Sequence, residues 1–159
     1  MVSDAPSFPV LPSVSGQFQA GAHYYPLRVY FEDTDAGGVV YHANYLCFME
    51  RARSDMLHLI GIEQRKTMDA GGGVYAVAKL AIDYVRPARL DDNLVVESRV
   101  TEVRAATCAI AQRVFRGTEL IASASVLVAF ISPEGKPRRQ PPAWIDLFNR
   151  IAQGNDLTP

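Results

Sequence analysis

The chain has 159 residues, a length that is typical of one domain. Its 16 basic and 17 acidic residues leave a net charge of −1, which excludes an overall basic nucleic-acid binder and an acidic disordered chain. Two cysteines and three histidines make neither a disulfide scaffold nor a good zinc site, and the longest apolar stretch, residues 120–131, is too short to span a bilayer.

The first 23 residues differ in composition from the rest of the chain. They contain three prolines, four serines and no lysine or arginine, and they lack the basic start and apolar run of a secretory signal. We therefore predict a flexible extension over residues 1–23, a folded domain over 24–152 and a C-terminal tail over 153–159. The chain is expected in the cytoplasm, where Cys47 and Cys108 stay reduced.

A strand and a long helix are predicted next along the chain. Apolar and polar residues alternate over 27–31, which is typical of a half-buried strand. After a loop over 33–43, apolar residues recur every three or four positions over 44–60, which predicts an amphipathic helix with Asn44 as its N-cap. The first turn of this helix is apolar nearly all round, so protein is expected on most of its sides.

The rest of the chain reads mainly as strands. The β-rich segments are residues 74–86, 94–103, 107–115 and 119–132, and a short helix is predicted over 141–152. Closely spaced strands favour antiparallel hairpins. The order of one strand, one long helix and then several strands predicts an α+β fold in which the helix covers an antiparallel sheet.

The loop between the first strand and the helix has the composition of a functional site. Three acids, Glu32, Asp33 and Asp35, lie within four residues, and two glycines and His42 follow. A calcium loop is excluded because residues 39–42 supply no carboxylate, and an aspartyl-phosphate phosphatase is excluded because it needs a parallel sheet. At least one of Asp33 and Asp35 is expected to hold the turn through a backbone hydrogen bond, Asp33 being the better candidate.

Residues 30–56, YFEDTDAGGVVYHANYLCFMERARSDM, resemble the signature of the 4-hydroxybenzoyl-CoA thioesterase family, and most closely its Tol–Pal-associated, YbgC-type branch. The segments RPARLDD (86–92) and GKPRR (135–139) are similar to later parts of the family. The resemblance implies a hotdog fold, in which an antiparallel sheet of about five strands wraps one long central helix. It also implies homodimers or homotetramers with active sites between subunits.

The same resemblance implies an acyl-CoA thioesterase, which hydrolyses a thioester to a free acid and coenzyme A and needs no separate cofactor or metal. The family's catalytic carboxylate falls on Asp35, which can attack the carbonyl carbon or take a proton from water; both routes stay open. His42 is the second catalytic candidate, and its backbone amide at the helix start is the candidate oxyanion donor. The oxyanion or site-lining candidates are Tyr41, Gly37, Gly38 and Asn44.

Coenzyme A carries phosphates, so a nearly neutral chain needs local cations to bind it. The candidates are Arg86, Arg89, Lys136, Arg138 and Arg139. Two other functions stay open: a hotdog-fold hydratase or dehydratase acting on an acyl thioester, and a non-catalytic partner of acyl carrier protein or of envelope-associated complexes. Neither a nucleic-acid partner nor a membrane span is expected.

Overall fold

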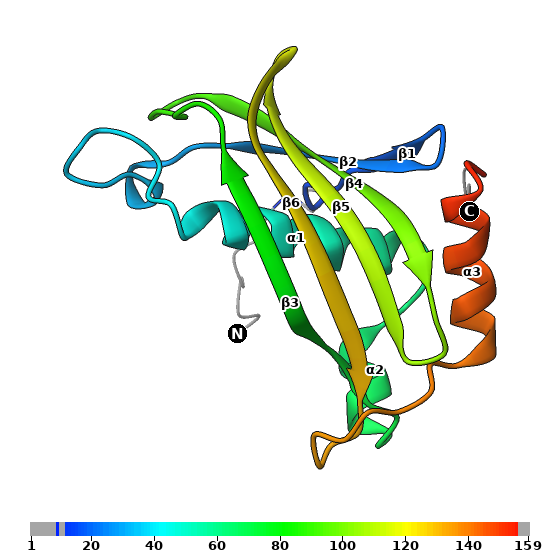
Figure 1. Ribbon diagram of the computed structural model, residues 1–159. Helices are drawn as coiled ribbons and strands as arrows, with labels where there is room; N and C mark the ends of the chain where they lie inside the picture. The colour runs from blue at the N-terminus through cyan, green and yellow to red at the C-terminus, as the bar shows by residue number, and fades with distance from the viewer. Residues whose placement is uncertain (1–8, 10–11, 156–159) are drawn as a thin grey trace, which may run out of the picture.

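A six-stranded antiparallel sheet forms the frame of the protein (Figure 1). The structure, a computed structural model, describes residue 9 and residues 12–155. The strands are β1 (Gln17–Gln19), β2 (Ala22–Arg28), β3 (Val74–Tyr84), β4 (Asn93–Val103), β5 (Thr107–Arg116) and β6 (Glu119–Ile131). They lie in the order β1-β2-β4-β5-β6-β3, so β3 forms one edge of the sheet.

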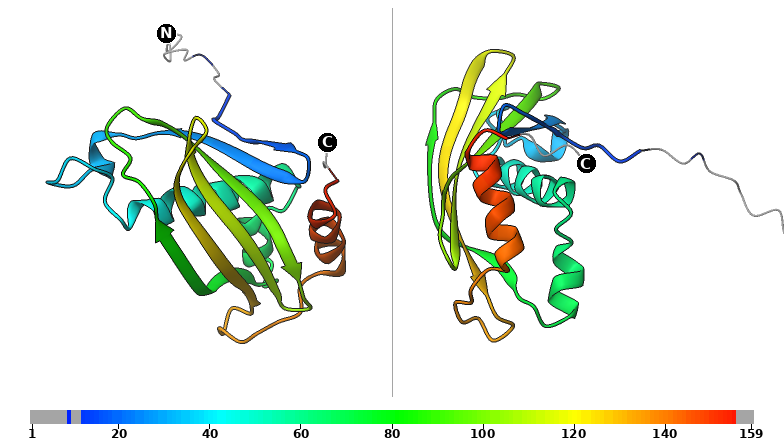
Figure 2. Two further views of the ribbon diagram at one scale, coloured as in Figure 1. Left: turned by 45° about the horizontal axis from the view of Figure 1, so that its top comes forward. Right: turned by 90° about the vertical axis from the view of Figure 1, so that its right-hand side faces the viewer.

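The helices lie on one side of this sheet (Figure 2). They are α1 (Asn44–Leu59), α2 (Gln64–Asp69) and α3 (Pro142–Ala152), and a short 3-10 turn, η1, spans Phe31–Asp33. The predicted α+β class, with a long helix across an antiparallel sheet, is confirmed. No helix among the described residues is long and apolar enough to cross a membrane.

The hydrophobic core lies between α1 and the sheet. The apolar stripe predicted for the helix is buried, and it includes Tyr45, Phe48, Met49, Ala52 and Met56. Opposite it, β4 buries every second residue from Leu94 to Val100. Because each large apolar side chain contributes about 1.5–3 kcal/mol when it is buried, this packing fixes α1 on the sheet together with the loop that precedes it.

Two predictions about the sheet were wrong. The sheet has six strands rather than about five; among the helices, α3 confirms the short helix predicted over 141–152, whereas α2 was not predicted. The first predicted strand was also placed too late, because β2 ends at Arg28 and Phe31, in η1, is 80% exposed. The chain turns away from the sheet after the buried Val29, so the alternation that continues to Phe31 does not describe a strand.

The folded domain also begins earlier in the chain than the predicted boundary at residue 24. β1 and the first residues of β2 lie inside the predicted extension, and Ala22 and His23 are fully buried. Left-handed backbone at Ala20 (φ 50°) closes the β1–β2 hairpin. A strand of only three residues shows no periodicity that would reveal it. Of the predicted extension, residues 1–8 and 10–11 lie outside the described part of the chain, as do residues 156–159 of the predicted C-terminal tail.

A buried histidine ties this N-terminal hairpin to α1. His23 Nε2 lies 2.6 Å from Asp55 Oδ2, and Asp55 also accepts hydrogen bonds from the Ser15 hydroxyl (2.8 Å) and the Gly16 amide (2.9 Å). His23 Nδ1 is buried without a hydrogen-bond partner among the described residues. Burial lowers the pKa of His23 below its ordinary value of 6.5, although the Asp55 carboxylate opposes this shift.

We expect the free energy of unfolding to fall as the pH is lowered below 6.5. A histidine whose pKa is lower in the folded state than in the unfolded state binds fewer protons when folded, so its stabilising effect is complete above pH 6.5 and is lost as the pH falls. Urea denaturation at pH 7.5 and 5.5 measures the loss. His23→Gln, which keeps a donor for Asp55, should show a smaller loss than the wild type. His58→Gln, at an exposed position of α1, should match the wild type; equal losses in all three proteins would contradict the assignment.

Candidate active site

Backbone hydrogen bonds hold the loop between β2 and α1 through Asp33. The buried carboxylate of Asp33 accepts a hydrogen bond from the Tyr30 amide (2.8 Å). The carbonyl oxygen of Asp33 accepts from the Tyr41 amide (2.9 Å) and from the side-chain amide of Asn44 (2.9 Å). Asp33 is therefore the acid that fixes the loop, as predicted.

Asp35 lies at the outer end of the same loop, in a tight turn. The Asp35 amide donates to the Val39 carbonyl (2.9 Å), and the Gly38 amide donates back to the Asp35 carbonyl (3.0 Å). Gly38 has φ +74°, a conformation that glycine adopts at little cost. The Gly37 amide donates to Asp35 Oδ1 (2.8 Å), while Asp35 Oδ2 accepts no hydrogen bond from the described residues. The exposed carboxylate thus keeps one oxygen free to react.

Asp35 and His42 line the same open groove. Its other walls come from Val39 and Val40 of the loop, from Tyr45 of α1 and from the end of β3 with the residues that follow it, including Tyr84 and Arg86. The Tyr84 hydroxyl donates to the His42 carbonyl (2.9 Å), so the end of β3 positions the start of the helix. The structure therefore brings together the two residues that the sequence suggested as catalytic.

The start of α1 presents unpaired amides near this groove. The Tyr41 amide donates to Asp33, and the Asn44 amide donates to the Tyr41 carbonyl (2.9 Å). Between them, the amides of His42 and Ala43 have no acceptor among the described residues. Free amides at a helix N-terminus favour a negatively charged oxygen, so this end of α1 has the chemistry of an oxyanion site.

The remaining loop candidates have other roles in the structure. Tyr41 is 46% exposed and rests its ring against that of His42 (4.4 Å between centroids), outside the groove lining. Asn44 is not the N-cap: that position is Ala43, and the Asn44 side chain holds Asp33 instead. Gly37 and Gly38 have no side chains, so they shape the Asp35 turn only through their backbone. Among the described residues, no cluster of three or more histidine, cysteine or acidic side chains could hold a metal ion.

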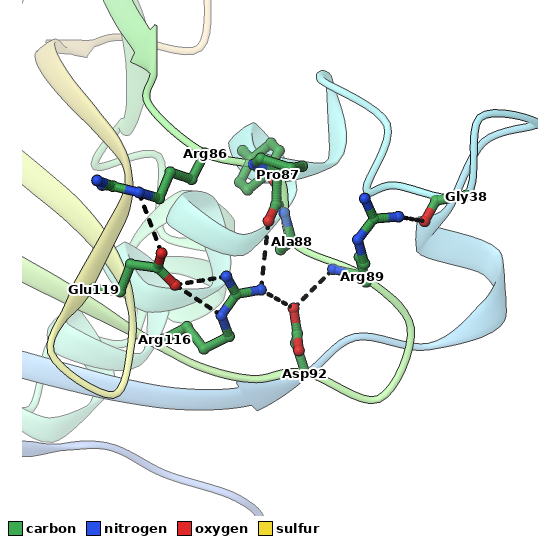
Figure 3. A network of polar contacts seen from close by, with 9 residues as sticks. Gly38, Arg86, Pro87, Ala88, Arg89, Asp92, Arg116 and Glu119 are labelled. Carbon is green, nitrogen blue, oxygen red and sulfur yellow. Dashed lines mark hydrogen bonds and ion pairs between the residues drawn. The ribbon is translucent and has the colours of Figure 1, made fainter.

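Arg86 and Arg89 belong to a polar network beside the loop (Figure 3). Arg86 pairs with Glu119 (3.2 Å), and Arg116 bridges Glu119 and Asp92. Burial alone would raise the pKa of Asp92, but hydrogen bonds from the Arg89 amide and the Arg116 side chain hold that pKa below its ordinary value. Arg89 also reaches the Gly38 carbonyl (3.4 Å), so the network fastens the β3–β4 connection to the Asp35 loop.

The second predicted basic group lies elsewhere in the protomer. Lys136, Arg138 and Arg139 occupy the connection between β6 and α3, which Figure 1 shows at the end of the sheet remote from the Asp35 loop. Arg138 donates to the Gly71 carbonyl (2.8 Å). A single protomer therefore does not bring the two basic groups together.

Sequence reasoning missed two tyrosines of the groove, Tyr45 and Tyr84. The Tyr45 hydroxyl accepts a hydrogen bond from the Ala88 amide (3.1 Å), so this residue supports the groove as well as the core. Tyr84 is separated from His42 by 42 positions, and no local pattern connects them. The one indication in the sequence was that Tyr84, a polar aromatic residue, lies near the end of the strand predicted over 74–86.

Comparisons with known proteins identify the family to which the chain belongs. The family model "Thioesterase superfamily" matches residues 37–123. The acyl-CoA thioesterase YbgC of Haemophilus influenzae is 48% identical over 107 residues, which cover 67% of this chain and 79% of that protein. The acyl-CoA thioester hydrolase YbgC of Escherichia coli O6:H1 is 41% identical over 128 residues, which cover 79% and 95% respectively. A probable thioesterase from Bartonella henselae has a similar structure, with a TM-score of 0.71 and 37% identity over 76% of this chain and 99% of that one.

The chain therefore belongs to the thioesterase superfamily and has its hotdog fold. It is an enzyme of the thioester hydrolase class, similar to the YbgC proteins. The matched segment contains α1 and its preceding turn from Gly37 onward, whereas Asp35 lies two positions before the match.

Proposed function

We propose that the protein hydrolyses acyl-CoA thioesters and that Asp35 is the catalytic carboxylate. The observation that carries this proposal is the shared groove, which is lined both by Asp35, with one carboxylate oxygen free, and by His42, whose backbone amide is unpaired. A thioester needs a nucleophile or base and a donor for the developing oxyanion, and it needs no strong general acid because its leaving thiol has a pKa of about 8.5. These are the two groups that the groove supplies.

Two routes are compatible with this arrangement. Asp35 can attack the carbonyl carbon, so that the carbon–sulfur bond breaks, the coenzyme A thiolate leaves and water then hydrolyses the mixed anhydride. Alternatively, Asp35 takes a proton from water, and the resulting hydroxide attacks the same carbon, so that the carbon–sulfur bond breaks and the coenzyme A thiolate leaves. In both routes the His42 amide donates to the carbonyl oxygen as it becomes negative, a contact whose loss costs about 3–4 kcal/mol in other acyl transfers.

Arg86 and Arg89 are the better candidates for the phosphates of coenzyme A. Arg86 lines the groove that contains Asp35, and its side chain is half exposed even though it pairs with Glu119. Arg89 reaches the loop itself at Gly38. The network contains three arginines and two carboxylates, Glu119 and Asp92. It therefore keeps one surplus positive charge, which suits an anionic ligand.

A homodimer formed through β3 fits the architecture. β3 is an edge strand of 11 residues, Val74–Tyr84, and a long unpaired edge is a ready template for a second copy. Two-fold symmetry would make this pairing antiparallel. We also propose a cytoplasmic location, in which the thiols of Cys47 and Cys108, free in the structure, would stay reduced.

A thiol-release assay over a series of acyl-CoA substrates tests the proposed activity. We expect hydrolysis of at least one of them, measured as free thiol, and no hydration of the matching enoyl-CoA. Hydration of enoyl-CoA without thiol release would support the hydratase alternative instead. A protein that releases no thiol and still captures acyl carrier protein would support the non-catalytic alternative.

A further inference from the structure

The peptide groups on the two sides of His42 are held in different ways. The carbonyl oxygen of Tyr41, in the first group, accepts from the Asn44 amide (2.9 Å), a bond within the main chain. The carbonyl oxygen of His42, in the second group, accepts from the Tyr84 hydroxyl (2.9 Å). Because a peptide group is planar, each bond fixes the direction of a whole group. The main chain therefore holds the first group, whereas one side chain holds the second.

The backbone that carries Tyr84 is anchored to the sheet on both sides. Tyr84 is the last residue of β3, and it lies opposite the buried Ala122 of β6. After the strand ends, the amides of Val85 and Arg86 both donate to the Ile121 carbonyl (2.8 and 3.1 Å). The hydroxyl that reaches His42 therefore comes from a fixed part of the sheet and not from a free loop.

Aromatic neighbours fix the direction of the Tyr84 side chain. Its ring packs edge-on against the ring of Tyr45 (5.6 Å between centroids) and against the imidazole of His42 (6.3 Å). Tyr45 is itself buried, and its hydroxyl accepts from the Ala88 amide (3.1 Å). A ring held in this way loses little further freedom when its hydroxyl donates, so the hydrogen bond to His42 costs little conformational entropy.

Other hydrogen bonds attach the chain before and after His42 but not His42 itself. The Val40 amide donates to the Ala88 carbonyl (2.8 Å), and the Asn44 side chain donates to the Asp33 carbonyl (2.9 Å). In the part of the chain that the structure describes, the Tyr84 hydroxyl is the one hydrogen-bond partner of His42. The position of His42, and with it that of its unpaired amide, therefore depends directly on Tyr84.

We propose that Tyr84 is a positioning residue for thioester hydrolysis, whose hydroxyl holds His42 so that the His42 amide can donate to the oxyanion. The inference rests on the proposed function, in which that amide stabilises the developing negative charge. The two peptide groups share the Cα atom of His42, so a movement of the second group shifts the donor in the first. Since such a donor acts mainly on the transition state, a small shift slows the reaction more than it weakens substrate binding.

Tyr84→Phe removes the hydroxyl and keeps the ring, so it tests the hydrogen bond alone. The assay uses the acyl-CoA that the wild type hydrolyses fastest. We expect kcat and kcat/KM to fall together by at least about tenfold, while KM stays within about twofold of the wild-type value. A kcat close to that of the wild type, or a KM that rises at constant kcat, would overturn the proposal. So would loss of native circular dichroism, because the hydroxyl would then support the fold and not the donor.

Tyr24→Phe is the matched control for this variant. The Tyr24 hydroxyl donates to Glu97 (3.1 Å), so the same substitution removes a similar hydrogen bond from β2, at a residue that does not line the groove. The control protein should keep the kcat and KM of the wild type. Equal losses of kcat in Tyr24→Phe and Tyr84→Phe would show a general effect of removing such a hydroxyl, and the particular role of Tyr84 would be wrong.

Infrared spectra of a bound thioester test whether Tyr84 acts on the oxyanion donor. Asp35→Asn should bind the same acyl-CoA, labelled with carbon-13 at its thioester carbonyl, without rapid hydrolysis. A hydrogen bond to the carbonyl oxygen lowers the stretching frequency of the labelled bond. We expect a smaller decrease in Asp35→Asn/Tyr84→Phe than in Asp35→Asn, and equal frequencies in the two proteins would overturn the proposal. A wild-type protein that releases no thiol from any acyl-CoA would instead overturn the proposed function itself.

Discussion

Replacement of Asp35 by asparagine is expected to lower kcat for acyl-CoA hydrolysis by at least about a hundredfold, the smallest effect typical of losing a general base or nucleophile. Asparagine keeps an oxygen that can accept the Gly37 amide, now 2.8 Å from Asp35 Oδ1, so the turn should survive. It removes the negative charge and the basic lone pair that either route requires. Thiol release measures the activity, and thermal unfolding should show an unchanged Tm.

Glu32→Gln is the matched control for this prediction. Glu32 is an exposed carboxylate three positions before Asp35, and it does not line the groove. The control protein should retain nearly all of the wild-type activity. If Glu32→Gln removed the activity and Asp35→Asn retained it, the catalytic carboxylate would be Glu32, and the groove would have been assigned to the wrong acid.

The parts of the fold that the sequence predicted are those with long periodic patterns. α1 was predicted over 44–60 and spans Asn44–Leu59, because its buried stripe runs through four turns. β4 was predicted equally well, since every second residue from Leu94 to Val100 is buried as expected, although Glu97 on the opposite face is buried too. β1 was missed because three residues carry no period, and Phe31 was misplaced because alternation does not report where a chain leaves its sheet.

The candidate site divides in a similar way. Asp35 and His42 could be placed in one site because seven positions of one loop separate them, and local sequence carries such patterns. Tyr84 could not be placed there because its contact with His42 depends on the register of β3. That register contains a shift between Val77 and Lys79, which puts Val77 and Leu80 on the same face. Only the packed sheet determines where such a bulge lies.

The second large expected effect concerns stability: Gln112→Leu should lower the free energy of unfolding by about 3 kcal/mol. Gln112 is fully buried on β5, and its oxygen accepts a hydrogen bond from Arg53 at 2.7 Å. Its side-chain amide donates to the Met49 carbonyl (3.0 Å) and to the Ser98 hydroxyl (2.9 Å). Leucine leaves the guanidinium of Arg53, itself only 8% exposed, without its buried acceptor. Urea denaturation measures the change.

Two further variants separate the loss of this hydrogen bond from a general intolerance of leucine. Gln19→Leu makes the same substitution at an exposed position of β1 and should change the stability by less than about 0.5 kcal/mol. The double variant Arg53→Met/Gln112→Leu removes donor and acceptor together, so it should recover much of the stability lost in Gln112→Leu. A double variant that is less stable than Gln112→Leu would mean that Arg53 stabilises α1 mainly through Glu50. The position of the Arg53 side chain would then depend on its ion pair with the exposed Glu50 rather than on the buried contact to β5.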